Sequence, residues 1–479
     1  MTEISAGRLA QLLGPLDLTG TAYREISERI RLLVVDGRLT DGARLPSERE
    51  LAASLGVSRT TTARVYAELR EADLISSRRG SGSVVRLPLH RSSASSLIIT
   101  PDDADTIAWT YSAPVGPPGM ARAFERAAGA LPALLGTTGY LPDGLPALRE
   151  VLAQQYRDRG LPTDPDQIIV TNGAMGAISL IARALVSRAD RVLVEGISYP
   201  HAHEAFVAAG ARLSALPVDE RPWDLEAARG LLRSAPHRAA YLVPEFHNPT
   251  AAVMSHEERS GWARELARHD VLPVVDESLY AVNLDGVDLP EPFACFDPRA
   301  ILVGSSSKPF WGGLRVGWIR TPRTHVMPLI QARMHDDLGS SAFDQLVLTE
   351  LLTDGGQTAA AGRATLRAAR DHLLAELARQ LPDFTAPCPA GGLNLWVRLP
   401  DRMSSRLTAA AGRHGLLLTP GPRFLAVAAR AGEQHLRLAY TQSHDTLTEA
   451  VARLSSAYDD VRDGVTARPA HSSTLDLIA

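Results

Sequence analysis

The sequence predicts an α/β protein in two parts, a small unit of helices with one hairpin and a larger domain built on a mainly parallel sheet. Three observations predict this division. The 479 residues are too many for one ordinary compact core. Residues 1–87 hold short helical patterns and one strand–turn–strand pattern, whereas beyond residue 110 short apolar runs alternate with amphipathic stretches. Between them, residues 88–110 are rich in Pro and Ser, which is the composition of a linker.

Composition narrows the class of protein. With 45% hydrophobic and 22% charged residues the chain is typical of soluble globular proteins. Its formal net charge of −4 gives no overall attraction to nucleic acid or anionic lipid, so any basic surface must be local. The two cysteines, Cys295 and Cys388, indicate neither a disulfide framework nor a metal site. We expect a cytoplasmic protein with no membrane partner and no metal, associated with the nucleoid when it binds DNA.

The stretch "RLPSERELAASLGVSRTTTARVYAELREADL" predicts two helices joined by a short turn. Ser47 is a good N-cap and has Glu50 three residues later, which makes a capping box. Gly56 supplies the turn, and Ser58 caps the next helix. Such a helix-turn-helix leaves its second helix free to enter a major groove. The donors that we expect to meet DNA from this stretch are Arg44, Ser47, Arg49, Ser58, Arg59, Thr60 and Thr61.

The next stretch, "LISSRRGSGSVVRL", predicts a hairpin whose turn contains Arg78, Arg79 and Gly80. This turn is a wing, and its arginines could meet backbone phosphate. Each feature alone also fits an ordinary capped helix or a solvated turn, but their order along the chain favours DNA binding. The whole segment resembles the winged helix of GntR-type bacterial regulators, which implies double-stranded DNA as a partner.

Past the linker, the runs "QIIVTNG", "RVLVEG", "ARLSALPV", "AAYLVPEF", "VLPVVDE" and "AILVGSS" read as short buried strands. Helical stretches separate them, which predicts a mainly parallel sheet with ligands at the carboxyl ends of its strands. We expect this large subdomain to span residues 111–336. The strands "LNLWVRL", "GLLLTPG" and "HLRLAY" predict a smaller α/β subdomain over 337–462, followed by a flexible tail over 463–479.

Lys308 is the only lysine among the fifty Lys and Arg residues of the chain. An amine can lose a proton and attack a carbonyl carbon, which a guanidinium cannot do. Asp276 closes another predicted strand, where a carboxylate can pair with a protonated ring nitrogen. The Asn248 amide can donate to a phenolate, and Tyr199 can stack on a flat ring. Groups that could hold a phosphate are Gly173 and Ala174 at a helix start, the hydroxyls of Ser305 and Ser307, and Arg315.

Each of these residues has an ordinary structural role as the alternative, such as a helix cap, a turn or a core tyrosine, but together they favour a cofactor site. The motifs "GYLPDGLPALREVLAQQYRDRG", "TNGAMGAI", "EFHNPT", "VVDESLY", "SSSKPFWGGLRVGW" and "HLRLAY" resemble those of fold-type I pyridoxal-phosphate enzymes of the aspartate aminotransferase class, over residues 110–455. The resemblance implies a fold-type I aminotransferase-like domain with pyridoxal 5′-phosphate as cofactor.

The same resemblance implies a role for each residue. Lys308 would form the internal aldimine, Asp276 would meet the pyridine nitrogen, and Asn248 the ring oxygen. Tyr199 would stack on the ring. The implied phosphate ligands are Gly173, Ala174, Ser305, Ser307 and Arg315. Tyr140 would reach the phosphate of a neighbouring subunit in a homodimer, and Arg437 would bind the carboxylate of an amino-acid ligand.

A winged helix joined to such a domain resembles the MocR (GabR-like) regulators. Two positions depart from the family pattern. Ser278 stands where a tyrosine is usual, with Tyr280 two residues later, and either could reach the ring oxygen. His201 stands where some members have a ligand-binding arginine.

Two functions follow from these features. In the first, the chain is a transcriptional regulator that binds paired DNA half-sites as a dimer and senses an amino compound or pyridoxal phosphate itself. In the second, it is an active aminotransferase with an appended DNA-binding domain. Intact capping and wing residues favour the first function, but the complete set of lysine, aspartate and arginine keeps transaminase chemistry open. A DNA-binding protein whose large domain only dimerises would not need Lys308.

Overall fold

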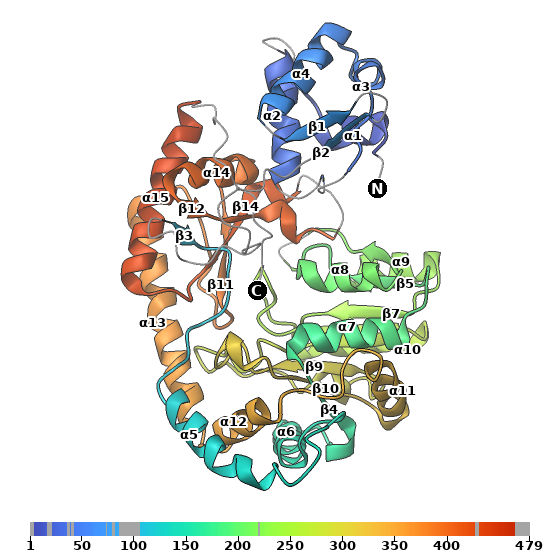
Figure 1. Cartoon of the computed structure of the whole chain (residues 1–479), viewed down its shortest axis with the longest axis vertical. Helices are drawn as coiled ribbons and strands as arrows, with labels where there is room; N and C mark the ends of the chain where they lie inside the picture. Colours follow the sequence, from blue (N-terminus) through green and yellow to red (C-terminus); the bar gives the residue numbers. More distant parts are fainter. Residues whose placement is uncertain are drawn as a thin grey trace.

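The computed structural model describes residues 4–16, 22–35, 39, 43–72, 74–78, 82–85, 106–218, 221–426 and 431–464. Figure 1 shows three bodies along the long axis of the molecule: an N-terminal unit at one end, a large sheet covered by helices at the other, and a smaller subdomain between them. We call the N-terminal unit the head.

The head has the predicted winged-helix arrangement. Its elements are α1 (Ala6–Leu13), α2 (Ala22–Val35), α3 (Glu48–Leu55), α4 (Arg59–Glu71), β1 (Ile75–Arg78) and β2 (Gly82–Val85). The capping box of Ser47 and Glu50 begins α3, and the Ser58 hydroxyl accepts from the backbone N–H of Thr61 to begin α4. Gly56 ends α3 at φ 67°, the left-handed conformation that glycine adopts most easily. Local residues therefore determine where α3 begins and ends and where α4 begins.

The large subdomain is a seven-stranded sheet between two helical layers. The strand order is β4-β10-β9-β8-β7-β5-β6, and β10 runs antiparallel to both of its neighbours. The strands are β4 (Ile168–Thr171), β5 (Arg191–Val194), β6 (Arg212–Ala215), β7 (Ala239–Leu242), β8 (Leu272–Asp276), β9 (Ile301–Ser305) and β10 (Gly317–Arg320). Along β4, Ile168 and Val170 face one layer and Ile169 the other. Burial on both faces explains why these strands read as continuous apolar runs.

Helices alternate with strands from β4 to β8, while two helices precede β4 and two follow β10. The helices are α5 (Met120–Ala130), α6 (Pro146–Asp158), α7 (Gly173–Leu185), α8 (Pro200–Ala208), α9 (Leu225–Ser234), α10 (His256–Arg268), α11 (Arg323–Arg333) and α12 (Ala342–Leu352). Residues of α7, α8 and α11 share one core with the sheet, and residues of α5, α6, α9, α10 and α12 share the core on the other face. Because β4 runs antiparallel to β10 and β10 antiparallel to β9, the carboxyl ends of β4, β5, β7, β8 and β9 meet at one edge.

The small subdomain packs a three-stranded antiparallel sheet, β11-β14-β13, against helices. Its elements are α13 (Gln357–Gln380), β11 (Asn394–Arg398), α14 (Ser404–Ala411), β12 (Leu416–Leu417), β13 (Thr419–Pro420), β14 (His435–Ala439) and α15 (His444–Arg462). Strand β3 (Ile107–Ala108) pairs in parallel with β12, so the end of the predicted linker belongs to this sheet layer. Since α12 shares the core of the large subdomain, we propose that the small subdomain begins at α13.

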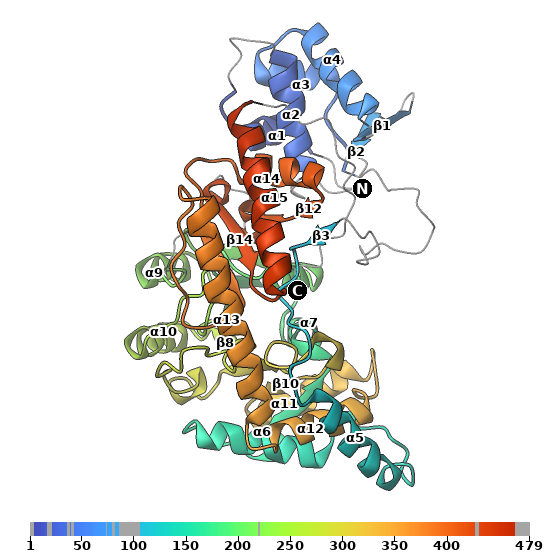
Figure 2. The same ribbon diagram turned by 90° about the vertical axis from the view of Figure 1, so that its left-hand side faces the viewer.

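The head contacts the small subdomain, because α2 packs against α14 (Figures 1 and 2). Arg79, Gly80, most of the linker and the tail after residue 464 lie outside the described residues. Within the described residues, no helix is both long and apolar enough to span a bilayer, and no cluster of His, Cys, Asp and Glu has the geometry of a metal site.

Candidate cofactor site

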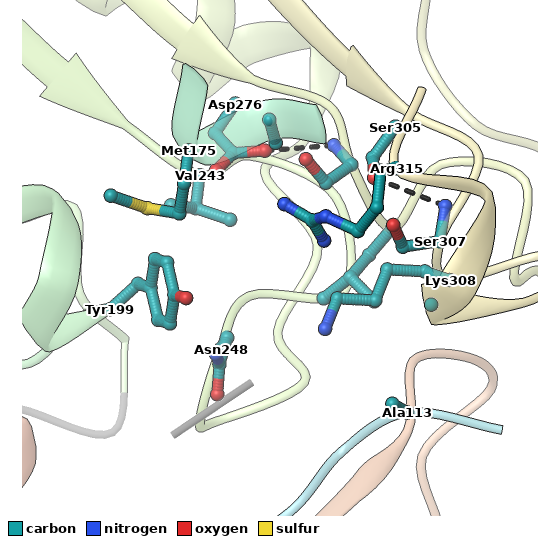
Figure 3. Close-up of a pocket in the computed structure, with 14 residues that line it drawn as sticks. Ala113, Met175, Tyr199, Val243, Asn248, Asp276, Ser305, Ser307, Lys308 and Arg315 are labelled. Atoms are coloured by element: carbon teal, nitrogen blue, oxygen red, sulfur yellow. Dashed lines mark hydrogen bonds between the residues drawn. The ribbon is translucent and has the colours of Figure 1, made fainter. Parts of the chain in front are cut away.

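A pocket lies at the edge where the carboxyl ends of the strands meet (Figure 3). It brings together predicted residues from five separate segments of the chain. Its lining consists of Ala113, Ala174, Met175, Tyr199, Val243, Asn248, Asp276, Ser278, Leu279, Ser305, Ser307, Lys308, Gly312 and Arg315. Two predicted cofactor residues are not part of the lining. Gly173 lies against the guanidinium of Arg315, and Tyr140 is the other.

Lys308 follows β9 and extends its amine into the pocket (Figure 3). Its Nζ donates to the backbone carbonyl of Ser112 at 3.1 Å. Burial, helped by the positive charge of Arg437, lowers the pKa of the amine to about 8, although the carboxylate of Asp276 opposes the shift. A substantial fraction of the amine is therefore neutral near pH 8, which is the form that can attack a carbonyl.

Asp276 is the last residue of β8 and is buried at the base of the pocket. Tyr241 Oη donates to its Oδ2 at 2.8 Å, and the backbone N–H of Ser278 donates to its Oδ1 at 2.9 Å. Burial nevertheless raises the pKa of this carboxyl group. A cation placed against Asp276 would offset the cost of burying the charged form, which suits a protonated ring nitrogen.

The residues after Asp276 separate into two environments. Ser278 lines the pocket, and its Oγ is buried without a hydrogen-bond partner among the described residues. Tyr280 instead lies under the guanidinium of Arg159, whose Cζ is 3.5 Å from the ring centroid. Of the two residues that the sequence left open, the structure places Ser278 at the pocket.

The start of α7 and the turn after β9 form a small polar cradle. Gly173 has φ 71°, and a Cβ on this residue would come 2.8 Å from Nη2 of Arg315. A Cβ on Gly317 would come 2.4 Å from the carbonyl carbon of Gly173, so both glycines are needed for this close approach. The Ser305 Oγ accepts from the backbone N–H of Ser307 at 3.2 Å. Helix N–H groups, hydroxyls and a guanidinium in one place suit a phosphate.

The opposite wall carries Tyr199 and Asn248. The phenol of Tyr199 faces the pocket, and burial raises its pKa, so it stays protonated at neutral pH (Figure 3). The Oδ1 of Asn248 is buried and has no hydrogen-bond partner within the described part of the chain. Buried polar atoms are normally satisfied, so the unpartnered atoms of Asn248 and Ser278 fit a pocket shaped for a polar ring. The residues present therefore fit pyridoxal phosphate.

Behind this wall, the buried carboxylate of Glu195 braces the loop that carries Asn248. It accepts from Ser198 Oγ at 2.6 Å, Trp223 Nε1 at 2.7 Å, the Val243 backbone N–H at 2.8 Å and His247 Nε2 at 3.2 Å. Burial opposes ionisation of Glu195, but the nearby His247 and these donors leave its pKa below the usual range. Glu195 is not among the residues predicted from the sequence, although a Glu directly after an apolar strand is a signal that could have identified it.

Arg437, the predicted carboxylate-binding residue, is fully buried on β14. Its Cζ lies 4.9 Å from the centroid of the Phe424 ring, and its Nη2 donates to the carbonyl of Thr110. Arg437 is close enough to lower the pKa of Lys308 through its charge. His201 lies beside this region, with its ring 5.5 Å from that of Tyr199 and its Nδ1 paired with Glu204 Oε2 at 2.8 Å.

The predicted DNA-contact residues of the helix-turn-helix stretch lie before and on α3 and at the start of α4. Arg49, Ser58, Arg59 and Thr60 are exposed, and Thr61 is half-buried. The guanidinium of Arg44 lies against the first residue of β2, because a Cβ on Gly82 would come 3.0 Å from its Nε. Ser47 serves as the cap of α3. The exposed start of α4 is therefore free to meet a nucleic acid.

Some pocket residues gave no signal in the sequence analysis. They are Ala113, Met175, Val243, Leu279 and Gly312. Met175 and Leu279 adjoin predicted motifs and could have been included by adjacency. Ala113 lies far from every motif, and only the fold brings it to the pocket.

Comparison with known proteins assigns the family. Residues 122–454 match the family described as "Aminotransferase class I and II", and residues 22–85 match the family described as "Bacterial regulatory proteins, gntR family". The chain therefore belongs to the class I and II aminotransferase family and carries a GntR-type DNA-binding unit at its N-terminus. This arrangement places it with the MocR-type regulators, and the family together with the fit of the pocket identifies pyridoxal 5′-phosphate as the cofactor.

Individual relatives fall into two groups. Among regulators, the chain is 29% identical to the HTH-type pyridoxine biosynthesis transcriptional regulator PdxR of Corynebacterium glutamicum, over 69% of this chain and 73% of that protein. It is 30% identical to the probable rhizopine catabolism regulatory protein MocR of Rhizobium meliloti, over 63% of this chain and 65% of that protein. Among solved structures, the α-aminoadipate aminotransferase LysN of Thermus thermophilus is similar with a TM-score of 0.67 and 26% identity, covering 75% of this chain and 93% of that one.

Proposed function

We propose that this protein is a pyridoxal-phosphate-dependent transcriptional regulator, in which the aminotransferase-like domain senses a small amino compound or the cofactor itself. The observation that carries the proposal is the presence, in one chain, of a cofactor pocket around Lys308 and a head whose α4 start is exposed. The relatives PdxR and MocR, whose names describe regulators, support a regulatory role.

In this proposal each predicted site residue has its own role. When bound, pyridoxal phosphate supplies an aldehyde for an amine and a ring that withdraws electrons. Lys308 supplies the amine, and Asp276 holds a proton at the ring nitrogen. Asn248 and Ser278 offer polar atoms to the ring, and Tyr199 covers its face. The phosphate ligands are Gly173, Ala174, Ser305, Ser307 and Arg315.

Arg437 is the residue that we assign to a ligand carboxylate. A buried guanidinium binds a carboxylate strongly because both the charge and the paired N–H donors are matched. The Nη2 of Arg437, which donates to the Thr110 carbonyl, could donate instead to a ligand carboxylate, which is a stronger acceptor. The ligand class that follows is a small compound with an amine for the cofactor and a carboxylate for Arg437.

We propose that the protein acts as a homodimer that presents two heads to paired half-sites on double-stranded DNA. Three large side chains are exposed that a second subunit could cover: Val115 is 75% exposed, Tyr140 66% and Trp311 41%. Val115 is two residues from the pocket residue Ala113, and Trp311 is next to Gly312. A second subunit would cover these side chains and bring its own Tyr140 to the neighbouring phosphate.

Two measurements test this proposal. The purified protein with pyridoxal phosphate should absorb visible light, and borohydride should fix the cofactor to Lys308. The same protein should bind the DNA upstream of its own gene and protect two half-sites. Tyr140→Phe should loosen cofactor retention in the dimer, whereas Tyr23→Phe in the head should not. A monomer that binds cofactor and protects a single half-site would contradict the dimer.

A second function, active transamination, is favoured by the lowered pKa of Lys308, because a partly neutral amine can also move protons. The two functions differ in turnover. A regulator should show a spectral change with an amino-acid donor that stops after one equivalent. Continuous production of oxo acid in the presence of a second oxo acid would establish the enzyme.

A further inference from the structure

The segment that joins β3 to α5 reaches the pocket at Ala113 and accepts hydrogen bonds from two cationic side chains, Lys308 in the pocket lining and the buried Arg437 outside it. Lys308 Nζ donates to the carbonyl of Ser112 at 3.1 Å, and Arg437 Nη2 donates to the carbonyl of Thr110. We call residues 109–113 the strap. Both residues that we assign to cofactor and ligand therefore bind backbone oxygens of the strap in this structure.

The strap is anchored to the small subdomain. Three side-chain bonds hold it there: Trp109 Nε1 to the Ala439 carbonyl at 2.6 Å, Thr441 Oγ1 to the Tyr111 carbonyl at 3.3 Å, and Ser112 Oγ to Asn394 Oδ1. Its first residue also donates its backbone N–H to the carbonyl of Leu417 at 2.9 Å. Trp109 is fully buried in the core of the small subdomain. The strap must therefore follow the small subdomain, while Lys308 ties it to the large one.

Binding in the pocket competes with these ties. If the neutral Lys308 amine condensed with the aldehyde of the cofactor, its nitrogen would form a double bond to the aldehyde carbon, and its two hydrogens would leave with the aldehyde oxygen as one water. The neutral imine nitrogen would then have no hydrogen for the Ser112 carbonyl. A ligand carboxylate likewise competes for Arg437, because it is a stronger acceptor than the neutral carbonyl of Thr110. Each binding event thus removes one tie of the strap.

The strap is also continuous with the DNA-binding head. At its N-terminal end it continues from β3, which pairs with β12. Strand β12 follows α14 through the short turn Gly412–His414, and α14 packs against α2 of the head. A shift of the strap and the small subdomain therefore reaches the head through packed elements as well as through the chain itself.

We propose that the strap, residues 109–113, couples occupancy of the cofactor pocket to the placement of the DNA-binding head. This inference rests on the proposed regulatory function. In the free protein the strap is tied to Lys308 and Arg437, and in the loaded protein these ties are released. A ligand can shift an equilibrium only by its differential affinity for two states, and exchange of the two ties supplies that difference.

Hydrogen–deuterium exchange on the full-length protein tests the release directly. Cofactor-free protein is compared with protein loaded with pyridoxal phosphate and not reduced. Borohydride reduction and peptide mapping of a separate sample confirm that Lys308 carries the cofactor, because reduction itself would return an N–H to the Lys308 nitrogen. Loss of one hydrogen bond should make the amides of residues 107–113 exchange roughly two- to tenfold faster in the loaded protein. Amides of β4, at the far end of the large sheet, should not change. Unchanged exchange over 107–113, in protein whose Lys308 carries the cofactor, would overturn the proposal and leave the regulatory function standing.

Variants test the coupling to DNA. Trp109→Phe removes the donor to Ala439 and keeps an aromatic core residue, and Thr441→Val removes the donor to Tyr111 at nearly equal volume. The matched controls are Trp262→Phe, a fully buried tryptophan that donates to the Trp223 carbonyl in the large subdomain, and Thr365→Val on the exposed side of α13. DNA affinity is measured for each protein with and without pyridoxal phosphate.

In the strap variants the ratio of cofactor-free to loaded DNA affinity should be at least about twofold closer to one than in wild type, whereas the controls keep the wild-type ratio. An equal ratio in Trp109→Phe and Trp262→Phe would refute the coupling. Equal DNA affinities of free and loaded wild-type protein would refute it as well, even with a released strap. If the strap variants do not fold, the exchange experiment on wild-type protein decides alone. Absence of any DNA binding would contradict the proposed function instead.

Discussion

The head and the cofactor pocket use cationic side chains under opposite conditions. In the head, Arg49 and Arg59 are exposed, so water and salt already stabilise their charges. In the pocket, Lys308 and Asp276 have pKa values displaced mainly by burial, and Arg437 is fully buried. The comparison teaches that one substitution in the pocket should remove a function, whereas one substitution in the head should weaken binding by degrees.

The largest expected effect is at Lys308. Lys308→Ala should fold as the wild type does but should lose all borohydride-fixed cofactor, because the chain has no second lysine. Peptide mapping after reduction measures this loss. Lys308→Arg is the matched control for charge, and it should also fail, because a guanidinium does not attack an aldehyde. Cofactor recovered on any other group, including the N-terminal amine, would contradict the assignment.

The second effect is in the head. Arg59→Ala should weaken specific DNA binding by roughly 5- to 150-fold if the guanidinium meets a base edge, since such contacts are worth about 1–3 kcal/mol. Arg49→Ala should instead reduce the salt dependence of binding by about one unit if it meets phosphate alone. Titrations at several salt concentrations separate the two, and Arg264→Ala on α10 is a control for lost surface charge. Unchanged DNA affinity in both head variants would contradict the claim that exposed arginines of the head contribute to DNA binding.

A smaller effect tests the phosphate cradle. Gly173→Ala places a Cβ at φ 71° and 2.8 Å from Arg315, so it should weaken cofactor binding by about tenfold. Gly160→Ala is the matched control, because it has φ 82° and no atom within 4 Å of the added Cβ. It should cost about 1 kcal/mol of stability without changing cofactor binding. Equal cofactor affinities in the two variants would show that the cradle does not hold the phosphate. Spectral titration and thermal unfolding measure the two quantities.

The smallest effect is a pH dependence of loading. The pKa of Lys308 is lowered to about 8, so the neutral amine is the minor form at pH 7 and the major form at pH 9. The initial rate of cofactor attachment should therefore rise about fivefold between pH 7 and pH 8 and level off above. The sign follows from burial, which disfavours the charged amine. Stopped-flow absorbance measures this rate, and a rise that continues to pH 10 would indicate an amine with an ordinary pKa.

Much of the cofactor site could be predicted from sequence because its side chains stand at strand ends. Asp276 and Ser305 end apolar strands, Lys308 follows three residues later, and parallel strands bring their carboxyl ends to one edge. The caps of α3 and α4 were likewise predictable, because Ser47 and Ser58 act on N–H groups within three residues. Such local and periodic signals are written in the residues themselves.

Tertiary structure alone decided the remaining features. Every residue has a backbone carbonyl, so no pattern could predict that Ser112 and Thr110 would offer theirs to Lys308 and Arg437. Packing also placed Ser278 at the pocket and turned Tyr280 under Arg159. The sequence by itself determined which side chains carry the chemistry. The fold decided which backbone closes over them, because contacts between residues about 200 or more positions apart depend on how whole elements pack.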